Sequence, residues 1–122
     1  MTPGQTGIAR IIAATGHSFR GMKACWEHEA AYRQDVMLSL VLFIASFFVA
    51  ERIEQWLLLV TPLILLIIVE ALNSAIEAVV DRIGAEYHDL SGRAKDIASS
   101  AVFFCHCIII LSWGAILWSN FG

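Results

Sequence analysis

Acidic and amide side chains recur at helical spacing in the stretch EALNSAIEAVVD, which runs from Glu70 to Asp81. On a helix, Glu70, Asn73, Ser74, Glu77 and Asp81 fall within an arc of about 100° and extend over about 16 Å of the axis. The residues before them are uncharged and apolar, so this stripe continues a hydrophobic helix. An acid at membrane depth costs at least about 2.5 kcal/mol by insertion scales, and function usually accounts for such a cost.

Three carboxylates on one helix face can relay protons or cations, or they can hold a divalent ion beside a general base. The stripe leads into the polar segment 86–96, EYHDLSGRAKD. In this segment Arg93 and Lys95 can neutralise phosphates, and Tyr87 or His88 can stack on a nucleotide base. This combination favours phosphoryl transfer at the end of a membrane helix. On the stripe alone, a proton-coupled transporter and a polar stripe that only holds helices together remain as alternatives.

The composition points to a membrane protein. Of the 122 residues, 58% are hydrophobic and 16% are charged, against roughly 45–50% and 25% in soluble domains. The net charge of −3, without a run of Lys or Arg, argues against binding to nucleic acid. Three cysteines at irregular spacing do not indicate a disulfide framework. We expect one all-α membrane domain over residues 1–122, inserted by its own helices without a cleaved signal peptide.

The first segment, residues 8–33, has the pattern of an amphipathic helix that lies on the membrane surface. Its apolar residues fall within an arc of about 100° on a helical wheel. They are Ile8, Ile11, Ile12, Phe19, Met22 and Trp26. Glu29 and Arg33 would fall on the same apolar side. Either the helix breaks near Gly16 or Gly21, or these two charged residues face protein partners instead of lipid.

Three hydrophobic segments follow, and we expect transmembrane helices at residues 34–50, 53–80 and 97–118. Residues 81–96 form a hydrophilic connector. Positive charges concentrate in the N-terminal segment and in this connector, at Arg10, Arg20, Lys23, Arg33, Arg82, Arg93 and Lys95. The turn after the first span has one arginine, and the C-terminal tail has no charge. The positive-inside rule therefore predicts that the N-terminus and the connector are cytoplasmic and that the C-terminus lies on the opposite side.

Four sequence runs together resemble the prokaryotic diacylglycerol kinase family over nearly the whole chain. They are EALNSAIEAVVD at residues 70–81, GRAKD at 92–96, GIARII at 7–12 and WEHEAAYRQ at 26–34. The resemblance implies a surface helix plus three transmembrane helices, assembled in the bacterial inner membrane as a homotrimer with shared active sites and a periplasmic C-terminus. It also implies ATP-dependent phosphorylation of 1,2-diacylglycerol to phosphatidic acid in phospholipid recycling, with Mg²⁺ accompanying the nucleotide.

The same resemblance implies roles for individual residues. Glu70 matches the general base, Asn73 a polar residue beside it, and Glu29 and Glu77 the ligands of the magnesium ion. The nucleotide-binding positions are Arg10, His17, Glu29, Glu77, Glu86, Tyr87, His88, Lys95 and Asp96. The positions that contact the lipid substrate are Arg10, Ser18, Phe19, Trp26, Arg33, Glu70, Ser99 and Trp113. Because the chain has neither a Walker A nor a protein-kinase motif, its phosphate site must be an independent one.

The chain departs from the family pattern at three places. His17 and Asp35 stand where relatives have tyrosine and glutamate, and the run Cys105-His106-Cys107 is not a feature of the family. Because consecutive helical residues point about 100° apart, this run cannot chelate a metal with all three side chains. We expect a buried, hydrogen-bonded His106 between two small apolar cysteines.

Three alternative functions have distinct consequences. An undecaprenol kinase of the same superfamily would keep the catalytic residues, although the match at residues 26–34 favours diacylglycerol. A small proton-coupled transporter would not need acids that lead into a GRAKD segment. A purely structural oligomer predicts that Glu77→Gln changes assembly and not any magnesium dependence.

Overall fold

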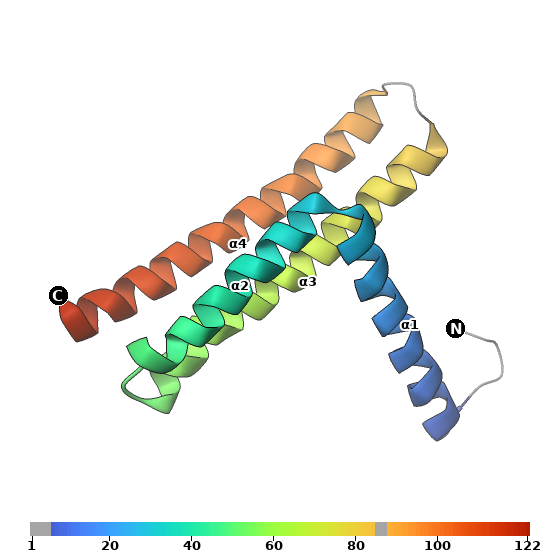
Figure 1. The fold of residues 1–122 in the computed structure, drawn as a ribbon. Helices are drawn as coiled ribbons and strands as arrows, with labels where there is room; N and C mark the ends of the chain where they lie inside the picture. The colour runs from blue at the N-terminus through green and yellow to red at the C-terminus, as the bar shows by residue number, and fades with distance from the viewer. Residues whose placement is uncertain (1–5, 85–87) are drawn as a thin grey trace.

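The computed structural model describes residues 6–84 and 88–122, so the predicted nucleotide-binding residues Glu86 and Tyr87 lie outside the described residues. The described chain folds into four helices (Figure 1). They are α1 (Gly7–His28), α2 (Ala30–Val49), α3 (Ile53–Ile83) and α4 (Asp89–Phe121). The last three lie side by side as a long bundle, and α1 leaves this bundle at a steep angle (Figure 1). The predicted all-α membrane class is confirmed.

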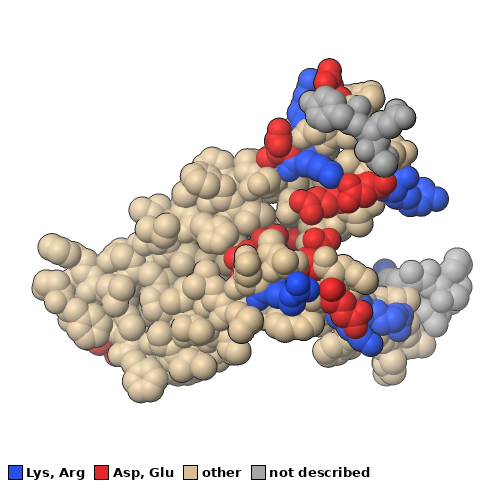
Figure 2. Space-filling model, turned by 45° about the horizontal axis from the view of Figure 1, so that its top comes forward, with Lys and Arg blue, Asp and Glu red and all other residues tan. Residues whose placement is uncertain are grey.

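The three bundle helices have the length and composition of membrane spans. In the part of the chain that the structure describes, α2, α3 and α4 are long and apolar enough to cross a bilayer. Their 20, 31 and 33 residues correspond to about 30, 45 and 50 Å of helix. The hydrocarbon layer is about 30 Å thick, so α3 and α4 have length to extend beyond it. Figure 2 shows most charged side chains at one end of the molecule, while the rest of this face is almost entirely uncharged.

The core of the bundle lies between α3 and α4. Leu59, Leu63 and Leu66 of α3 pack against a stripe on α4 that consists of Cys105, Ile109, Trp113 and Ile116. Partly buried residues of α2 border this core, namely Leu42, Ala45 and Val49. Large apolar side chains also cover the outer faces of the three bundle helices. This distribution suits a bundle whose outer surface meets lipid.

Helix α1 keeps its apolar stripe exposed. None of its residues is buried, and Ile8, Ile11, Ile12 and Phe19 are 64–76% exposed. Helix α1 meets the bundle near the end at which the charged side chains gather (Figures 1 and 2). This arrangement suits the surface helix that the amphipathic pattern predicts.

The break in the N-terminal segment lies at Glu29 and not at a glycine. Helix α1 is continuous through Gly16 and Gly21 and ends at His28. Glu29 has extended backbone angles (φ −120°, ψ 106°) and separates α1 from α2. The surface helix is therefore shorter than the predicted 8–33, and the helix after it begins before residue 34.

The connector between α3 and α4 is also shorter than the predicted 81–96. Helix α3 continues to Ile83 and α4 begins at Asp89, so most of this segment is helical. His88 caps α4, because its Nδ1 accepts a hydrogen bond from the backbone N–H of Leu90 at 3.0 Å. The predicted limits of the connector, 81 and 96, were placed at the first and last charged residues between the two apolar segments. A helix continues past its apolar part where water or ion pairs satisfy those charges.

Candidate active site

Glu70 is almost completely buried in the bundle, with 3% of its surface exposed. Its carboxyl group lies beside the side chains of Asp35 on α2 and Asn73 on its own helix. The acid therefore faces polar partners inside the protein, which limits the cost of placing it in an apolar bundle. A carboxyl group held in this way can exchange a proton with a hydroxyl group bound beside it.

The next turns of α3 continue the polar stripe. Asn73 Nδ2 donates to Glu77 Oε1 at 3.5 Å, while Asn73 Oδ1 is buried without a partner among the described residues. Ser74 is buried and lies beside the thiol of Cys25 on α1. Burial raises the pKa of the Cys25 thiol, and the nearby charge of Glu29 raises it further. The C-terminal end of α1 therefore packs against the stripe.

The junction between α1 and α2 holds Glu29 at this end of the bundle. The backbone N–H of Glu29 donates to Cys25 O at 2.9 Å. From the first turn of α2, Arg33 Nη1 donates to Trp26 O at 2.6 Å and to Glu27 O at 3.4 Å. These bonds satisfy carbonyl groups at the C-terminus of α1. The predicted lipid-contacting residues Arg33 and Trp26 are thus directly linked.

An ion pair links α3 to α4 at the polar end. Lys95 Nζ lies 2.8 Å from Asp81 Oδ1. His88 precedes the first turn of α4, and Asp96 and Ser99 are exposed farther along that helix. Figure 2 shows acidic side chains among basic ones at this end. Cations and acids together can bind a phosphate-bearing ligand and its counter-ion.

Four predicted site residues on α1 lie apart from the stripe. His17 and Ser18 are exposed and make side-chain hydrogen bonds within α1. Arg10 and Phe19 are also exposed. Among the side-chain hydrogen bonds of the described residues, none joins these four side chains to α3. One chain therefore does not bring them to Glu70.

Trp113 belongs to the core of the bundle. It is 8% exposed, and its indole Nε1 donates to Leu59 O at 3.1 Å. Leu59 precedes Glu70 by about 16 Å of helix axis. The contacts of Trp113 therefore connect it with the packing of α3 against α4 and not with the carboxylate stripe.

The family of the chain follows from its similarity to known proteins. Residues 16–117 match the family model of prokaryotic diacylglycerol kinase. The chain belongs to this family. A diacylglycerol kinase of Escherichia coli K12 is 49% identical over 123 residues, covering 100% of both chains. Relatives of the same name from Pseudomonas aeruginosa and Helicobacter pylori are 45% and 37% identical, over 93% and 94% of this chain and 93% and 90% of their own. The predicted membership in a lipid kinase family is confirmed.

Glu29 and Glu77 of this prokaryotic diacylglycerol kinase family member have the donor chemistry that Mg²⁺ prefers. Mg²⁺ usually binds through one or two carboxylates, with water and substrate phosphates as its other ligands. Within residues 6–84 and 88–122, no three or more His, Cys, Asp and Glu side chains are grouped to hold a metal ion. The donor set therefore fits an ion that arrives with a nucleotide and not one held by a complete protein cage.

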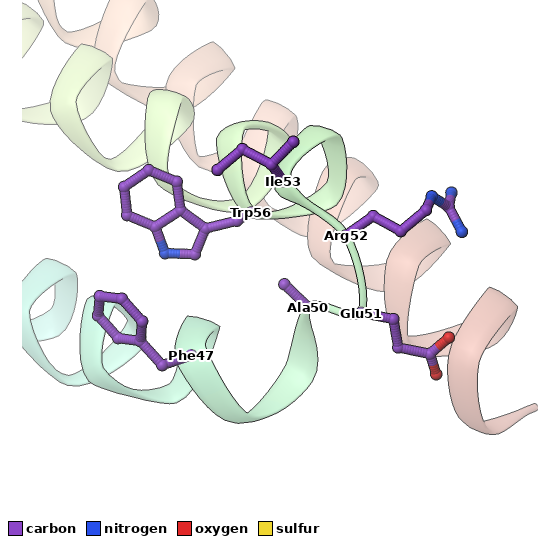
Figure 3. Close-up of a pocket in the computed structure, with 6 residues that line it drawn as sticks. All are labelled: Phe47, Ala50, Glu51, Arg52, Ile53 and Trp56. Atoms are coloured by element: carbon purple, nitrogen blue, oxygen red, sulfur yellow. The ribbon is translucent and has the colours of Figure 1, made fainter.

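A hollow at the other end of the bundle lies away from the stripe. Its volume is about 410 Å³, and it is lined by Phe47, Ala50, Glu51, Arg52, Ile53 and Trp56 (Figure 3). The rings of Phe47 and Trp56 lie on one side of it, and the side chains of Glu51 and Arg52 point away from these rings (Figure 3). Trp56 precedes Glu70 by about 21 Å of helix axis. The hollow is therefore separate from the carboxylate stripe of this lipid kinase family member.

The predicted site residues omit three neighbours of the stripe, Cys25, Asp35 and His106. Asp35 contacts Glu70 directly, and His106 Nε2 lies 3.3 Å from Asp35 Oδ1. His106 is hydrogen-bonded as expected, but its side chain is 39% exposed instead of buried. The sequence carries a signal for Asp35, because the resemblance implies glutamate at this position. No such signal exists for His106, because helical spacing relates residues of one helix and His106 and Glu70 lie on different helices.

Proposed function

We propose that this protein transfers the γ-phosphate of ATP to the free hydroxyl of 1,2-diacylglycerol, giving phosphatidic acid for phospholipid recycling. The observation that carries the proposal is the buried Glu70 on a helix whose acidic stripe continues to the polar end of the bundle. Along this helix a lipid that stays in the membrane can meet a nucleotide that stays in water. Membership in the prokaryotic diacylglycerol kinase family, and the name of its relatives, support this substrate.

Glu70 is the general base in this proposal. Its carboxylate accepts the hydroxyl proton while the lipid oxygen bonds to the γ-phosphorus and the bond from that phosphorus to the bridging oxygen of ADP breaks. Asn73 lies beside Glu70 and donates a hydrogen bond to Glu77. Its buried Oδ1, which has no partner among the described residues, can accept a hydrogen bond from the lipid hydroxyl. Asn73 would then position the hydroxyl beside the base.

Glu29 and Glu77 would hold the magnesium ion that accompanies ATP. When bound there, it would neutralise charge on the nucleotide's phosphates. The remaining nucleotide contacts come from Arg10, His17, Glu86, Tyr87, His88, Lys95 and Asp96. Because Lys95 is paired with Asp81 in the structure, a phosphate oxygen has to share or replace this carboxylate when the nucleotide binds. The exposed position of the pair leaves it accessible to such an exchange.

A homotrimer with shared active sites accounts for the distance between the stripe and the α1 residues Arg10, His17, Ser18 and Phe19. The proposed lipid-binding residues Arg10, Ser18, Phe19, Trp26, Arg33, Ser99 and Trp113 lie on three helices of one chain. A neighbouring subunit can bring its α1 to the α3 stripe. If sites are shared, mixing inactive Glu70→Gln chains with inactive Arg10→Ala chains restores part of the activity. No recovery in verified mixed oligomers would refute the sharing of these residues.

We place the N-terminus and the α3–α4 connector on the cytoplasmic side of the bacterial inner membrane, with the C-terminus in the periplasm. The concentration of positive charges at one end of the bundle supports this orientation (Figure 2). A reporter enzyme that is active only in the periplasm should be active after Gly122 and inactive after Gly84. The opposite pattern would reverse the orientation.

Transfer of labelled γ-phosphate from ATP to dioleoylglycerol in mixed micelles tests the function, with phosphatidic acid identified by mass spectrometry. Glu70→Gln keeps the shape of the side chain and removes its basic carboxylate, so kcat should fall by about 10²–10⁴-fold. Glu54→Gln is a matched control, because Glu54 is an exposed acid near the opposite end of α3. Full activity in Glu70→Gln would refute its role as the base.

The same assay distinguishes the lipid substrates. Undecaprenol offered at equal mole fraction should be phosphorylated much more slowly than dioleoylglycerol. A strong preference for the polyprenol would overturn the choice of diacylglycerol. Absence of phosphate transfer to either lipid, together with proton-coupled uptake that depends on Glu70, would favour a transporter instead.

A further inference from the structure

A hydrogen-bonded pair outside the proposed base and metal ligands links α2 to α4. His106 Nε2 lies 3.3 Å from Asp35 Oδ1, although 71 residues separate them in the sequence. His106 Nδ1 lies 3.0 Å from Val102 O on its own helix. Since a carbonyl oxygen only accepts hydrogen bonds, Nδ1 must carry the hydrogen of this bond. The imidazole is thus fixed by the backbone of α4 with its Nε2 turned toward Asp35.

Asp35 lies in the middle of a row of three side chains. Its side chain is 13% exposed, so it is more enclosed than His106. Its second partner is the carboxyl group of Glu70. A carboxyl group enclosed between these two side chains cannot rotate without losing one of the two contacts. The row therefore joins α4, α2 and α3 and ends at the proposed base.

We infer that His106 is a positioning residue, which orients the Asp35 carboxyl group and thereby holds Glu70 where it meets the lipid hydroxyl. This inference rests on the proposed role of Glu70 as general base. Proton transfer requires the base within hydrogen-bond reach of the hydroxyl, and a misplacement of about 1 Å can cost about 10²-fold in rate.

Steady-state kinetics of two variants test the inference. His106→Leu removes both ring nitrogens, whereas the side-chain amide of His106→Gln offers both a hydrogen-bond donor and an acceptor to Asp35. We expect His106→Leu to lower kcat by at least about tenfold, since even a partial displacement of the base slows transfer. The KM values for diacylglycerol and for MgATP should stay unchanged. His106→Gln should recover most of the lost kcat, which a general loss of packing would not predict.

Two further variants separate positioning from packing. Cys107→Ala alters a neighbouring, partly buried side chain of α4 and should keep the wild-type kcat. Asp35→Asn combined with His106→Leu should be no slower than Asp35→Asn alone, because His106 acts through Asp35. A wild-type kcat in His106→Leu, or losses that multiply in the double variant, would overturn the inference. If His106→Leu does not fold, His106→Asn replaces it, since its amide is too short to reach Asp35.

A second measurement does not depend on catalysis. In protein with ¹⁵N-labelled histidine, the ring resonances of His106 are assigned by their absence from His106→Gln. Asp35→Asn should shift these resonances, whereas Asp81→Asn should not. A shift in a protein that phosphorylates no lipid would support the contact and refute the proposed function. If the protein is an active kinase but Asp35→Asn leaves the His106 resonances unchanged, the inference is overturned and the proposed function is not.

Discussion

Glu70, Glu77 and Asp81 share one face of α3 and differ in burial. Glu70 is buried, Glu77 is half-buried and Asp81 is exposed. A metal ion that arrives with water and a nucleotide must reach its protein ligand, Glu77, from the aqueous side. The base, Glu70, must instead meet a lipid hydroxyl inside the membrane. The gradient of exposure therefore gives side chains of similar chemistry different tasks in the proposed reaction.

Glu77→Gln tests the proposed metal ligand. The amide keeps the size of the side chain and loses the charge that attracts Mg²⁺. We expect the Mg²⁺ concentration at half-maximal activity to rise at least about tenfold. A loss of metal affinity of this size is typical even when only a group that hydrogen-bonds to a metal ligand is removed. Titration of Mg²⁺ at fixed free ATP measures this shift. Glu27→Gln is the control, because Glu27 is an exposed acid paired with Lys23 on α1. Unchanged Mg²⁺ dependence in Glu77→Gln would contradict the assignment.

Cys25 reports on the charge of Glu29. Burial raises the pKa of the Cys25 thiol, and Glu29 raises it further, so less reactive thiolate is present at a given pH than in an unperturbed cysteine. Glu29→Gln removes one of these causes. The midpoint of the pH–alkylation curve should therefore move to lower pH, although burial keeps it above that of the SDS-unfolded chain.

Mass-spectrometric mapping of the alkylated peptides distinguishes Cys25 from Cys105 and Cys107. The midpoint of the curve, unlike the rate at one pH, is insensitive to a change in access to the thiol. Glu27→Gln is again the control and should leave the midpoint in place. A midpoint that stays fixed or rises in Glu29→Gln would show that Glu29 is not close to the thiol.

At the scale of elements, the junction of α1 and α2 determines where the surface helix points. The chain changes direction at one extended residue, Glu29, and no buried residue anchors α1 along its length. Arg33 hydrogen-bonds with two carbonyl groups at the C-terminus of α1. A cation is favourable at this end of a helix because it opposes the negative end of the helix dipole. Arg33 thus fixes the end of α1 nearest the stripe.

Arg33→Ala should loosen this junction. We expect backbone amides of residues 26–33 to exchange hydrogen several-fold faster, because the carbonyl groups of Trp26 and Glu27 lose a charged donor. Hydrogen-exchange mass spectrometry in detergent micelles measures the effect. Arg20→Ala is the matched control, since Arg20 contacts His17 within α1 and does not bridge two helices. Equal exchange in Arg33→Ala and the wild type would contradict this role.

The helices could be predicted from the sequence, and the contacts between them could not. Long apolar segments identify the three spans, and the 3.6-residue period groups Glu70 with Asn73 and Glu77. Periodicity is insensitive to a single extended residue, so it carried the surface helix past Glu29 to residue 33. It also describes one helix at a time. The pairing of Asp35 with His106, 71 residues apart, depends on how α2 and α4 pack, which one sequence does not encode locally.

At the scale of the whole molecule, the two ends of the bundle are built differently. One end carries the carboxylate stripe and the ion pair between Asp81 and Lys95. The other end is closed by an amide network, in which Gln55 and Asn120 exchange two hydrogen bonds of 2.9 Å. Asn120 also donates to Val49 O at 2.8 Å, and so ties the C-terminal end of α4 to α2. We expect the first end to determine activity and the second to contribute mainly to stability.

Gln55→Ala tests this division of tasks. Gln55 is 3% exposed, and its loss leaves Asn120 and the backbone N–H of Glu51 without this partner. An unsatisfied buried polar group costs about 1–3 kcal/mol, so SDS-induced unfolding should begin at a lower detergent mole fraction. Because Gln55 lies about 22 Å from Glu70 along α3, kcat of the folded protein should not change. Asn120→Ala added to Gln55→Ala should cost less than the two single losses together, since both variants break the same bonds. Additive losses, or a lower kcat in fully folded Gln55→Ala, would mean that the two ends are coupled.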